Sequence, residues 1–246
     1  MESSQKVSVL IPAHNEENYL GKCLDSLLAL NNPNVEIIVC NNNSTDRTCD
    51  IVQQYPTVHL VHETKKGPNA ARQKAFESSS GSIIATLDAD CIVPKNWINQ
   101  GISHFSKPNV VAVSGVCDFD NQGLLSVILT IATRYIMRFV HLIAHHIVGT
   151  HGIMMGANAW YRRTTLENIG GFNADIEFFG DDAHTAQMLS KEGIIDYDIH
   201  LRVMTSSRRF NQGGWIRTMY HYSINYLSMW ISGKQITAKK KTHHYR

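Results

Sequence analysis

The stretch "VSVLIPAHNEENYLGKCLDSLLALNNPNVEIIVC", residues 7–40, decides the fold of this chain. Residues 7–12 and 35–40 are short runs rich in β-branched side chains, and "EENYLGKCLDSLLAL" between them has the apolar spacing of an amphipathic helix. Two strands joined by a helix usually run parallel in one sheet. The sequence therefore predicts a β-α-β unit at its start.

The same alternation continues to residue 87. "TDRTCDIVQQY" and "NAARQKAFESSS" are typical of helices, whereas "TVHLVH" and "SIIATL" are typical of strands. This order predicts an α/β fold with a mostly parallel sheet and helices on both faces. Ligands of such sheets bind beyond the carboxyl ends of the strands, where this chain has "PAHNE", "NNNSTD" and "DAD".

The second half of the chain is less regular. We expect a helix near residues 95–105, a strand at 110–115, a strand at "GANAWYRR" and a helix at "DDAHTAQMLSKEG". The sequence shows neither internal repeats nor a low-complexity linker, so we expect one domain over residues 1–212. Residues 213–246 are expected to form an amphipathic helix and a basic tail.

Composition narrows the class of protein and its compartment. A formal charge of +2 spread over 246 residues does not suggest a nucleic-acid partner. The five cysteines are odd in number and never spaced as CxxC, which favours neither a disulfide framework nor a zinc site. The N-terminus does not resemble a signal peptide, and no apolar run reaches the roughly 20 residues of a spanning helix. We therefore expect a cytoplasmic protein.

Two aspartates, Asp88 and Asp90, follow the apolar strand at residues 82–87. If the extended geometry continued past Leu87, both side chains would point to one side, and their repulsion would call for a cation. Mg²⁺ commonly binds one or two carboxylates together with substrate phosphates. The alternative is a turn with two solvated aspartates. Neither GxGxxG nor GxxxxGK[ST] occurs, so nicotinamide chemistry and a P-loop have no support.

Six motifs in order resemble the family 2 glycosyltransferases of the GT-A fold, whose pattern runs P-x-x-N-E, D-D-G-S-x-D, G-x-x-x-A-R-N, D-x-D, G-G-F and E-D. This chain shows "PAHNE" (12–16), "NNNSTD" (41–46), "GPNAARQ" (67–73), "DAD" (88–90), "GGF" (170–172) and "GDD" (180–182). The resemblance spans residues 6–210. It implies a half that binds a nucleotide sugar at about 6–116 and an acceptor half at about 117–212.

The resemblance implies transfer of a sugar from a nucleotide diphosphate sugar to an acceptor hydroxyl, with inversion, in the synthesis of cell-surface polysaccharide, glycolipid or lipid-linked glycan. Asp90 with Asp88 would hold Mg²⁺ or Mn²⁺, which neutralises the departing diphosphate. Asp182 aligns with the second residue of the E-D pair and would be the catalytic base. The residues that would bind the donor are Pro12, His14, Glu16, Asn41, Arg72, Asp88, Ala89 and Arg208.

The chain departs from the family pattern at two positions. Asn41 stands where aspartate usually accepts a hydrogen bond from the base, so the donor base stays open, with UDP favoured over GDP. Asp181 stands where glutamate is usual. The third metal ligand is unassigned, with His151 and His221 as candidates. Arg208 and the adjacent Arg209 either clamp a phosphate or form an exposed surface pair.

Two amphipathic segments bear on the acceptor. In residues 124–148 the polar side chains form one helical stripe: Arg134, Arg138, His141 and His145. Such a helix either lies in a membrane interface with its cations toward the headgroups, or packs on the domain or in a dimer with the stripe in solvent. A second helix at 214–231 carries an aromatic stripe that suits a membrane interface or a core, and a basic tail follows it. Together they favour peripheral membrane contact and a lipid-linked acceptor.

Two rival functions remain open. A sugar-1-phosphate nucleotidyltransferase shares the architecture but needs a glycine-rich basic loop after the first strand, and "PAHNEENYLGK" does not resemble one. A non-catalytic relative that binds a nucleotide sugar or a partner subunit is suggested by Asn41 and Asp181.

Overall fold

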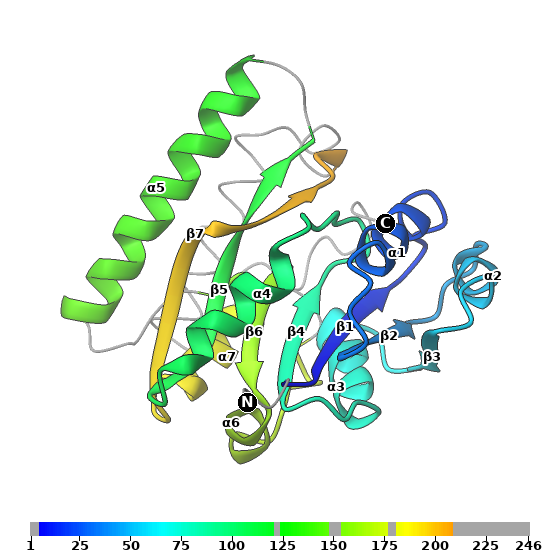
Figure 1. The fold of residues 1–246 in the computed structure, drawn as a ribbon, viewed down its shortest axis with the longest axis horizontal. Helices are drawn as coiled ribbons and strands as arrows, with labels where there is room; N and C mark the ends of the chain where they lie inside the picture. The colour runs from blue at the N-terminus through cyan, green and yellow to red at the C-terminus, as the bar shows by residue number, and fades with distance from the viewer. Residues whose placement is uncertain (1–4, 121–123, 148–153, 177–180, 209–246) are drawn as a thin grey trace.

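The computed structural model describes residues 5–120, 124–147, 154–176 and 181–208. These residues build a seven-stranded sheet in the order β3-β2-β1-β4-β6-β5-β7 (Figure 1). The strands are β1 (Val7–Ala13), β2 (Val35–Asn41), β3 (Val58–His62), β4 (Ile83–Leu87), β5 (Val110–Phe119), β6 (Asn158–Arg162) and β7 (Ile194–Thr205). The helices are α1 (Leu20–Leu28), α2 (Thr48–Gln53), α3 (Pro68–Glu77), α4 (Trp97–Ser103), the 3-10 turn η1 (His104–Ser106), α5 (Leu124–Ile147), α6 (Arg163–Asn168) and α7 (Asp181–Leu189).

The predicted β-α-β-α-β-α-β order of the first 90 residues is confirmed. β1 pairs in parallel with both β2 and β4, and β2 pairs in parallel with β3. Because successive strand residues point to opposite faces, Val9 and Ile11 join the core on one side of the sheet while Leu10 joins the core on the other. Helices α1, α2 and α4 contribute to the first core, and α3, α6 and α7 to the second.

The second half completes the sheet with one reversed strand. β6 runs antiparallel to β4 on one side and to β5 on the other, and β5 then pairs in parallel with β7. The sequence missed β7 altogether, and the strand expected at residues 110–115 extends to Phe119. The helix expected at 95–105 is divided into α4 and η1.

A tryptophan pair joins the two halves of the sheet. The rings of Trp97 on α4 and Trp160 on β6 have centroids 4.6 Å apart, and both side chains are fully buried. Trp97 Nε1–H donates to Asn158 Oδ1 at 3.0 Å. A Cβ on Gly101 would lie 2.4 Å from Trp160, so only glycine lets α4 approach β6 this closely. This packing fixes β6 beside β4, next to the strand ends that carry the site.

Helix α5 lies along the edge of the molecule beside β5 and β7 (Figure 1). Among the residues that the structure describes, no helix is both long enough and apolar enough to cross a membrane. The helix expected at 214–231, the basic tail, Arg209 and the two candidate ligands His151 and His221 lie outside the described residues.

Candidate functional site

The polar motifs meet at one edge of the sheet. The carboxyl ends of β1, β2 and β4 are neighbours there because these strands run parallel and adjacent. β4 ends at Leu87, and the Cys91 N–H donates to the Asp88 carbonyl at 3.0 Å, so the chain turns at once. The extended geometry considered for Asp88 and Asp90 does not continue, and the two carboxylates contact different arginines.

Arg72 is the centre of the first group of side chains. It lies on the buried face of α3, is 5% exposed, and its guanidinium contacts three carboxylates. Nη1 donates to Asp181 Oδ2 at 2.7 Å, Nη2 donates to Asp88 Oδ1 at 3.1 Å, and Asp182 Oδ1 lies 4.0 Å from Nη1. Burial disfavours the charge, but these carboxylates outweigh it and raise the pKa of Arg72. Arg72 of α3 is therefore a fixed cation that contacts Asp88, which follows β4, and two residues of α7.

Asp182 begins helix α7 together with Asp181, as the sequence predicted. The Gly156 N–H donates to Asp182 Oδ2 at 2.8 Å, and Oδ1 lies 4.0 Å from Arg72 Nη1. Burial of the carboxylate, followed by the charge of Asp181, raises the pKa of Asp182 to about 7, although Arg72 and the Gly156 N–H oppose this. A carboxylate with its pKa near neutrality is a more effective base than an ordinary aspartate.

Gly156 is a site residue that the sequence did not identify. A Cβ at this position would lie 2.3 Å from Asp182 Oδ1 and 2.9 Å from Arg72 Nη2. The absence of a side chain therefore lets the loop before β6 press against the carboxylate and donate its N–H. From the sequence, "GAN" is predicted only as part of a strand. A glycine near the start of a strand does not by itself indicate a site residue.

Arg208 is the centre of the second group. Its guanidinium makes a bidentate pair with Glu16, with Nη1 to Oε2 at 2.8 Å and Nη2 to Oε1 at 2.5 Å. Nη2 also lies 3.3 Å from Asp90 Oδ2, and the guanidinium carbon stands 4.4 Å from the centre of the Tyr19 ring. Thr205, at the end of β7, donates from its hydroxyl to Asp90 Oδ1 at 3.2 Å. The chain after β7 thus reaches back to the loop after β1, so Arg208 is not an exposed surface arginine.

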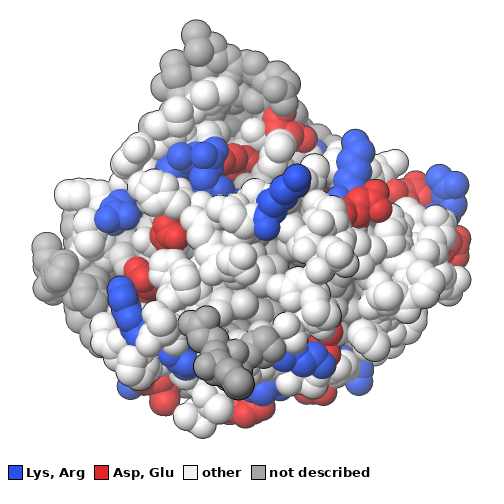
Figure 2. Space-filling view, viewed as in Figure 1, with Lys and Arg blue, Asp and Glu red and all other residues white. Residues whose placement is uncertain are grey.

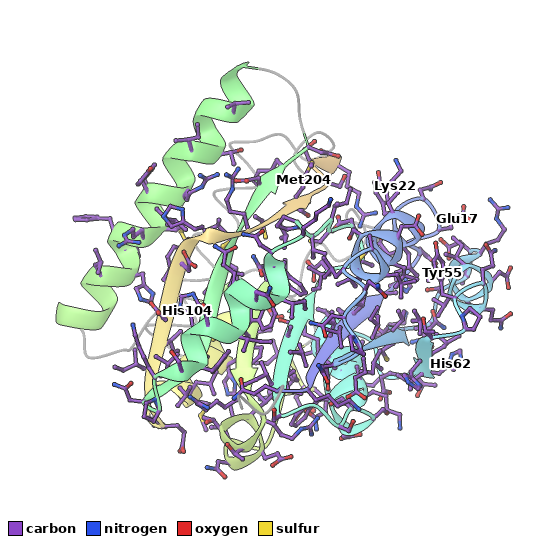
Figure 3. The ribbon with its side chains drawn as sticks, viewed as in Figure 1. Glu17, Lys22, Tyr55, His62, His104 and Met204 are labelled. Atoms are coloured by element: carbon purple, nitrogen blue, oxygen red, sulfur yellow. The ribbon has the colours of Figure 1, made fainter. Side chains whose placement is uncertain are left out.

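Asn41 lies at the end of β2 and is 8% exposed. Its Oδ1 accepts the Ser44 N–H at 3.2 Å, and its Nδ2 lies 3.4 Å from His62 Nδ1 at the end of β3 (Figure 3). The side-chain oxygen of Asn41 thus already accepts a hydrogen bond from its own loop. His62 contacts a predicted site residue but was not itself predicted from the sequence.

The remaining predicted donor residues lie at the same edge with different exposures. Pro12 pairs with Cys40 within the sheet, and His14 Nδ1 lies 2.6 Å from the Asn42 carbonyl oxygen. Ala89 is 3% exposed and its side chain packs in the core beneath β4. The structure therefore brings Asp88, Asp90 and Asp182 together with two arginines, and the donor-binding role of the buried Ala89 stays a prediction.

Asp88 and Asp90 fit a hard divalent cation by the chemistry of their donor set. Both offer carboxylate oxygens, and their side chains are 30% and 9% exposed. Among the described residues, no group of three or more His, Cys, Asp or Glu side chains is close enough to hold a metal. A cation at these aspartates would complete its coordination with substrate phosphates and water.

Comparison with known proteins agrees with this arrangement. The sequence pattern of Glycosyl transferase family 2 matches residues 8–170. Glycosyltransferase AglE of Haloferax volcanii is 30% identical over 196 residues, which are 76% of this chain and 62% of AglE. The chain therefore spans less than two thirds of that relative.

Solved structures share the fold. The mannosyltransferase PcManGT from Pyrobaculum calidifontis, in complex with GDP-Man and Mn²⁺, superposes with a TM-score of 0.74 at 23% identity over 94% of this chain and 66% of that one. S. aureus TarS 1-349 in complex with UDP gives a TM-score of 0.60 at 18% identity over 82% of this chain and 60% of TarS. These similarities confirm the expected GT-A type fold.

Proposed function

Because the chain belongs to glycosyltransferase family 2, we propose that it moves a sugar from a nucleotide diphosphate sugar to the hydroxyl group of an acceptor. The single observation that carries this proposal is the Asp182 carboxylate, held by Arg72 and the Gly156 N–H beside the aspartates of the β4 turn. Residues 6–116 form the half that binds the donor, and residues 117–212 the half that receives the acceptor.

The donor diphosphate binds beside the β4 turn. Asp90 and Asp88 would hold Mg²⁺ or Mn²⁺, which when bound would neutralise the charge that develops on the departing diphosphate. Arg208 contributes a guanidinium that suits phosphate oxygens, at a position where it already contacts Asp90 and Glu16. The base and ribose bind beyond the ends of β1 and β2, near Pro12, His14 and Asn41.

Asp182 acts as the base. Its Oδ1 takes the proton of the acceptor hydroxyl while the hydroxyl oxygen forms a bond to the anomeric carbon of the sugar. The bond between that carbon and the phosphate oxygen breaks, and its electron pair leaves with the nucleotide diphosphate. Attack opposite the leaving group inverts the anomeric centre. The near-neutral pKa of Asp182 supports this role because a base near the working pH transfers protons most effectively.

The donor nucleotide is UDP in our proposal, so the base is uracil. Asn41 has no charge, and its Oδ1 already accepts the Ser44 N–H, so a strongly accepting group of the kind that aspartate provides is missing at this position. The solved complexes named above contain a guanine nucleotide in PcManGT and a uracil nucleotide in TarS, so the fold accommodates either base.

We further propose a lipid-linked acceptor at the cytoplasmic face of a membrane, with peripheral contact by this chain. The support is helix α5, which lies at the edge of the molecule and carries apolar side chains on its exposed side. The transfer would belong to the synthesis of a cell-surface polysaccharide, glycolipid or lipid-linked glycan.

The test is a donor panel with purified protein. Binding and hydrolysis of UDP, GDP, CDP and dTDP sugars are measured with Mn²⁺, Mg²⁺ or EDTA, for the wild type, Asp90→Ala and Asp182→Asn. Asp175→Asn is the matched control, because Asp175 is an exposed acid that pairs with Lys65 and contacts neither Arg72 nor Arg208 in the described residues. We expect metal-dependent binding of a UDP sugar that Asp90→Ala loses, and turnover that only Asp90→Ala and Asp182→Asn lose. Binding without turnover would favour the non-catalytic reading, and no binding to any donor would overturn the proposal.

A further inference from the structure

Among the described side chains of residues 130–142, helix α5 turns Arg134 and His141 toward the sheet, the reverse of an ordinary surface helix. The Arg134 guanidinium, 15% exposed, donates to the Asp118 carboxylate on β5, and Arg202 on β7 holds the same carboxylate with Nε at 2.6 Å from Oδ2. His141 is 7% exposed, and its ring lies 5.2 Å from the Tyr197 ring on β7. The expected stripe of cations therefore does not face headgroups or solvent at Arg134 and His141, because an ion pair and a ring contact turn it toward the sheet.

The apolar side of α5 faces away from the protein. Six large apolar residues over about three turns, roughly 17 Å of helix, are each between 40% and 63% exposed. They are Ile131, Tyr135, Ile136, Phe139, Val140 and Leu142. Figure 2 shows a largely uncharged surface where this helix lies at the edge of the molecule. Exposed apolar residues that are contiguous in this way mark an interaction site, whereas isolated ones do not.

The charge of α5 indicates what covers this face. Its 24 residues contain two arginines and three histidines and no acidic residue. Arg138 is exposed beside the apolar residues, and the chain adds a run of three lysines at 239–241. An apolar face with cations and without acids is complementary to a surface of acyl chains and anionic headgroups. A surface that binds a partner protein has no general reason to lack acidic residues, as α5 does.

We propose that the outward face of α5 binds an anionic lipid surface, with Ile136 and Phe139 entering the acyl region and Arg138 at the headgroups. This deepens the proposed membrane contact, on which it rests, but it is independent of the proposed sugar transfer. The strand β7 ends beside the site, with Thr205 on Asp90, and its earlier residues lie against α5. A membrane at α5 would thus be connected to the donor site by a single strand.

The test is vesicle flotation of the full chain without donor or acceptor. Vesicles of phosphatidylcholine alone are compared with vesicles that also contain phosphatidylglycerol, for the wild type, Ile136→Ser/Phe139→Ser and Arg138→Gln. Leu28→Ser is the matched control, since Leu28 is an exposed apolar residue on α1, away from α5. Thermal unfolding and donor binding are measured for every variant, so that loss of the fold or of the donor site is distinguished from loss of lipid binding.

We expect the wild type to float with the anionic vesicles and the double variant to partition about tenfold or more weakly, because two buried apolar side chains are removed from the acyl region. Arg138→Gln should weaken binding only to the anionic vesicles, and Leu28→Ser should bind as the wild type does. Equal binding by the wild type and the double variant would overturn the proposal. The proposal would also be overturned if the wild type did not bind vesicles. This includes the case in which it dimerises through α5 and the double variant is monomeric.

Discussion

Replacing the proposed base with its amide, Asp182→Asn, should stabilise the protein while it removes turnover. Burial and the neighbouring Asp181 raise the pKa of Asp182 from 3.8 to about 7. The folded state therefore binds this proton more tightly than the unfolded state does. By linkage, the free energy of unfolding falls as the pH rises between these two values, because folding holds an anion in a place that disfavours it. The asparagine variant does not carry this penalty.

The size of the gain follows from the same pKa. A rise from 3.8 to about 7 corresponds to at most about 4 kcal/mol. A third of the Asp182 side chain is exposed and Asp181 shares the interaction, so we reduce the expected gain to about 1–2 kcal/mol. In a domain of this size that corresponds to a rise in Tm of about 2–8 °C. The gain should be near zero at about pH 4 and complete above about pH 7.

The assay is chemical and thermal unfolding of wild type and Asp182→Asn across this pH range in EDTA, so that bound metal does not alter the pKa. Asp175→Asn is the control, because the exposed Asp175 carboxylate pairs with Lys65, which lowers its pKa, and its removal should give no comparable gain. A gain of the same size at every pH would refute the reasoning, because it would come from packing and not from ionisation. Destabilisation at pH 8 would refute it as well.

Two further predictions concern geometry and a distant ion pair. Gly156→Ala should lower kcat/KM about a hundredfold or more, because its Cβ would lie 2.3 Å from Asp182 Oδ1 and 2.9 Å from Arg72 Nη2 and must displace the base. Steady-state kinetics checks this, and unchanged kcat and KM in a variant that folds as the wild type does would contradict it. His104→Gln should destabilise the protein by about 1 kcal/mol at pH 6 and by less at pH 9, as measured by urea unfolding. His104 Nδ1 lies 2.8 Å from Asp196 and Nε2 3.1 Å from Asp198, beside β7 (Figure 3). Hydrogen bonding to Asp196 raises the pKa of His104, so its contribution is present below about pH 6.5 and lost as the pH rises through the folded pKa. An identical loss at both pH values would contradict this assignment.

Local periodicity was sufficient for the first half of the fold. Three of the four strands there, β1, β2 and β4, are short runs such as "VEIIVC" that are buried on both faces, and helices alternate with the strands. β7 was missed although its pattern was present. Its odd-numbered residues from Ile195 to Val203 are apolar, while Asp196, Asp198 and Arg202 alternate with them. The aspartates and His200 resembled a loop, whereas they lie on one side of a strand, where His104 of η1 contacts both aspartates.

The features of the site that the sequence did not predict depend on contacts between residues that are far apart in the chain. The motifs identified Arg72, Asp88 and Asp182, which lie within α3, directly after β4 and in the first turn of α7. Gly156 acts through contact with a residue 26 positions away, and nothing in its local sequence indicates that contact. Likewise, the period of α5 revealed a polar and an apolar side but not which one faces inward. The Arg134–Asp118 pair decides that orientation, and it depends on where β5 ends.

The charges around Asp88 and Asp90 bear on why a cation would bind there. Two guanidinium groups, those of Arg72 and Arg208, stand among five carboxylates: Glu16, Asp88, Asp90, Asp181 and Asp182. Each aspartate of the β4 turn has its own arginine, so their mutual repulsion is already relieved, yet the cluster as a whole keeps an excess of negative charge. A diphosphate brought to such a cluster would be repelled unless a divalent cation accompanied it or carboxylates took up protons. Burial of the carboxylate, followed by the charge of Asp181, raises the pKa of Asp182, so this excess accounts for part of the rise. The proposed metal dependence of donor binding and part of the proposed basicity of Asp182 would thus share an origin in the local surplus of carboxylates.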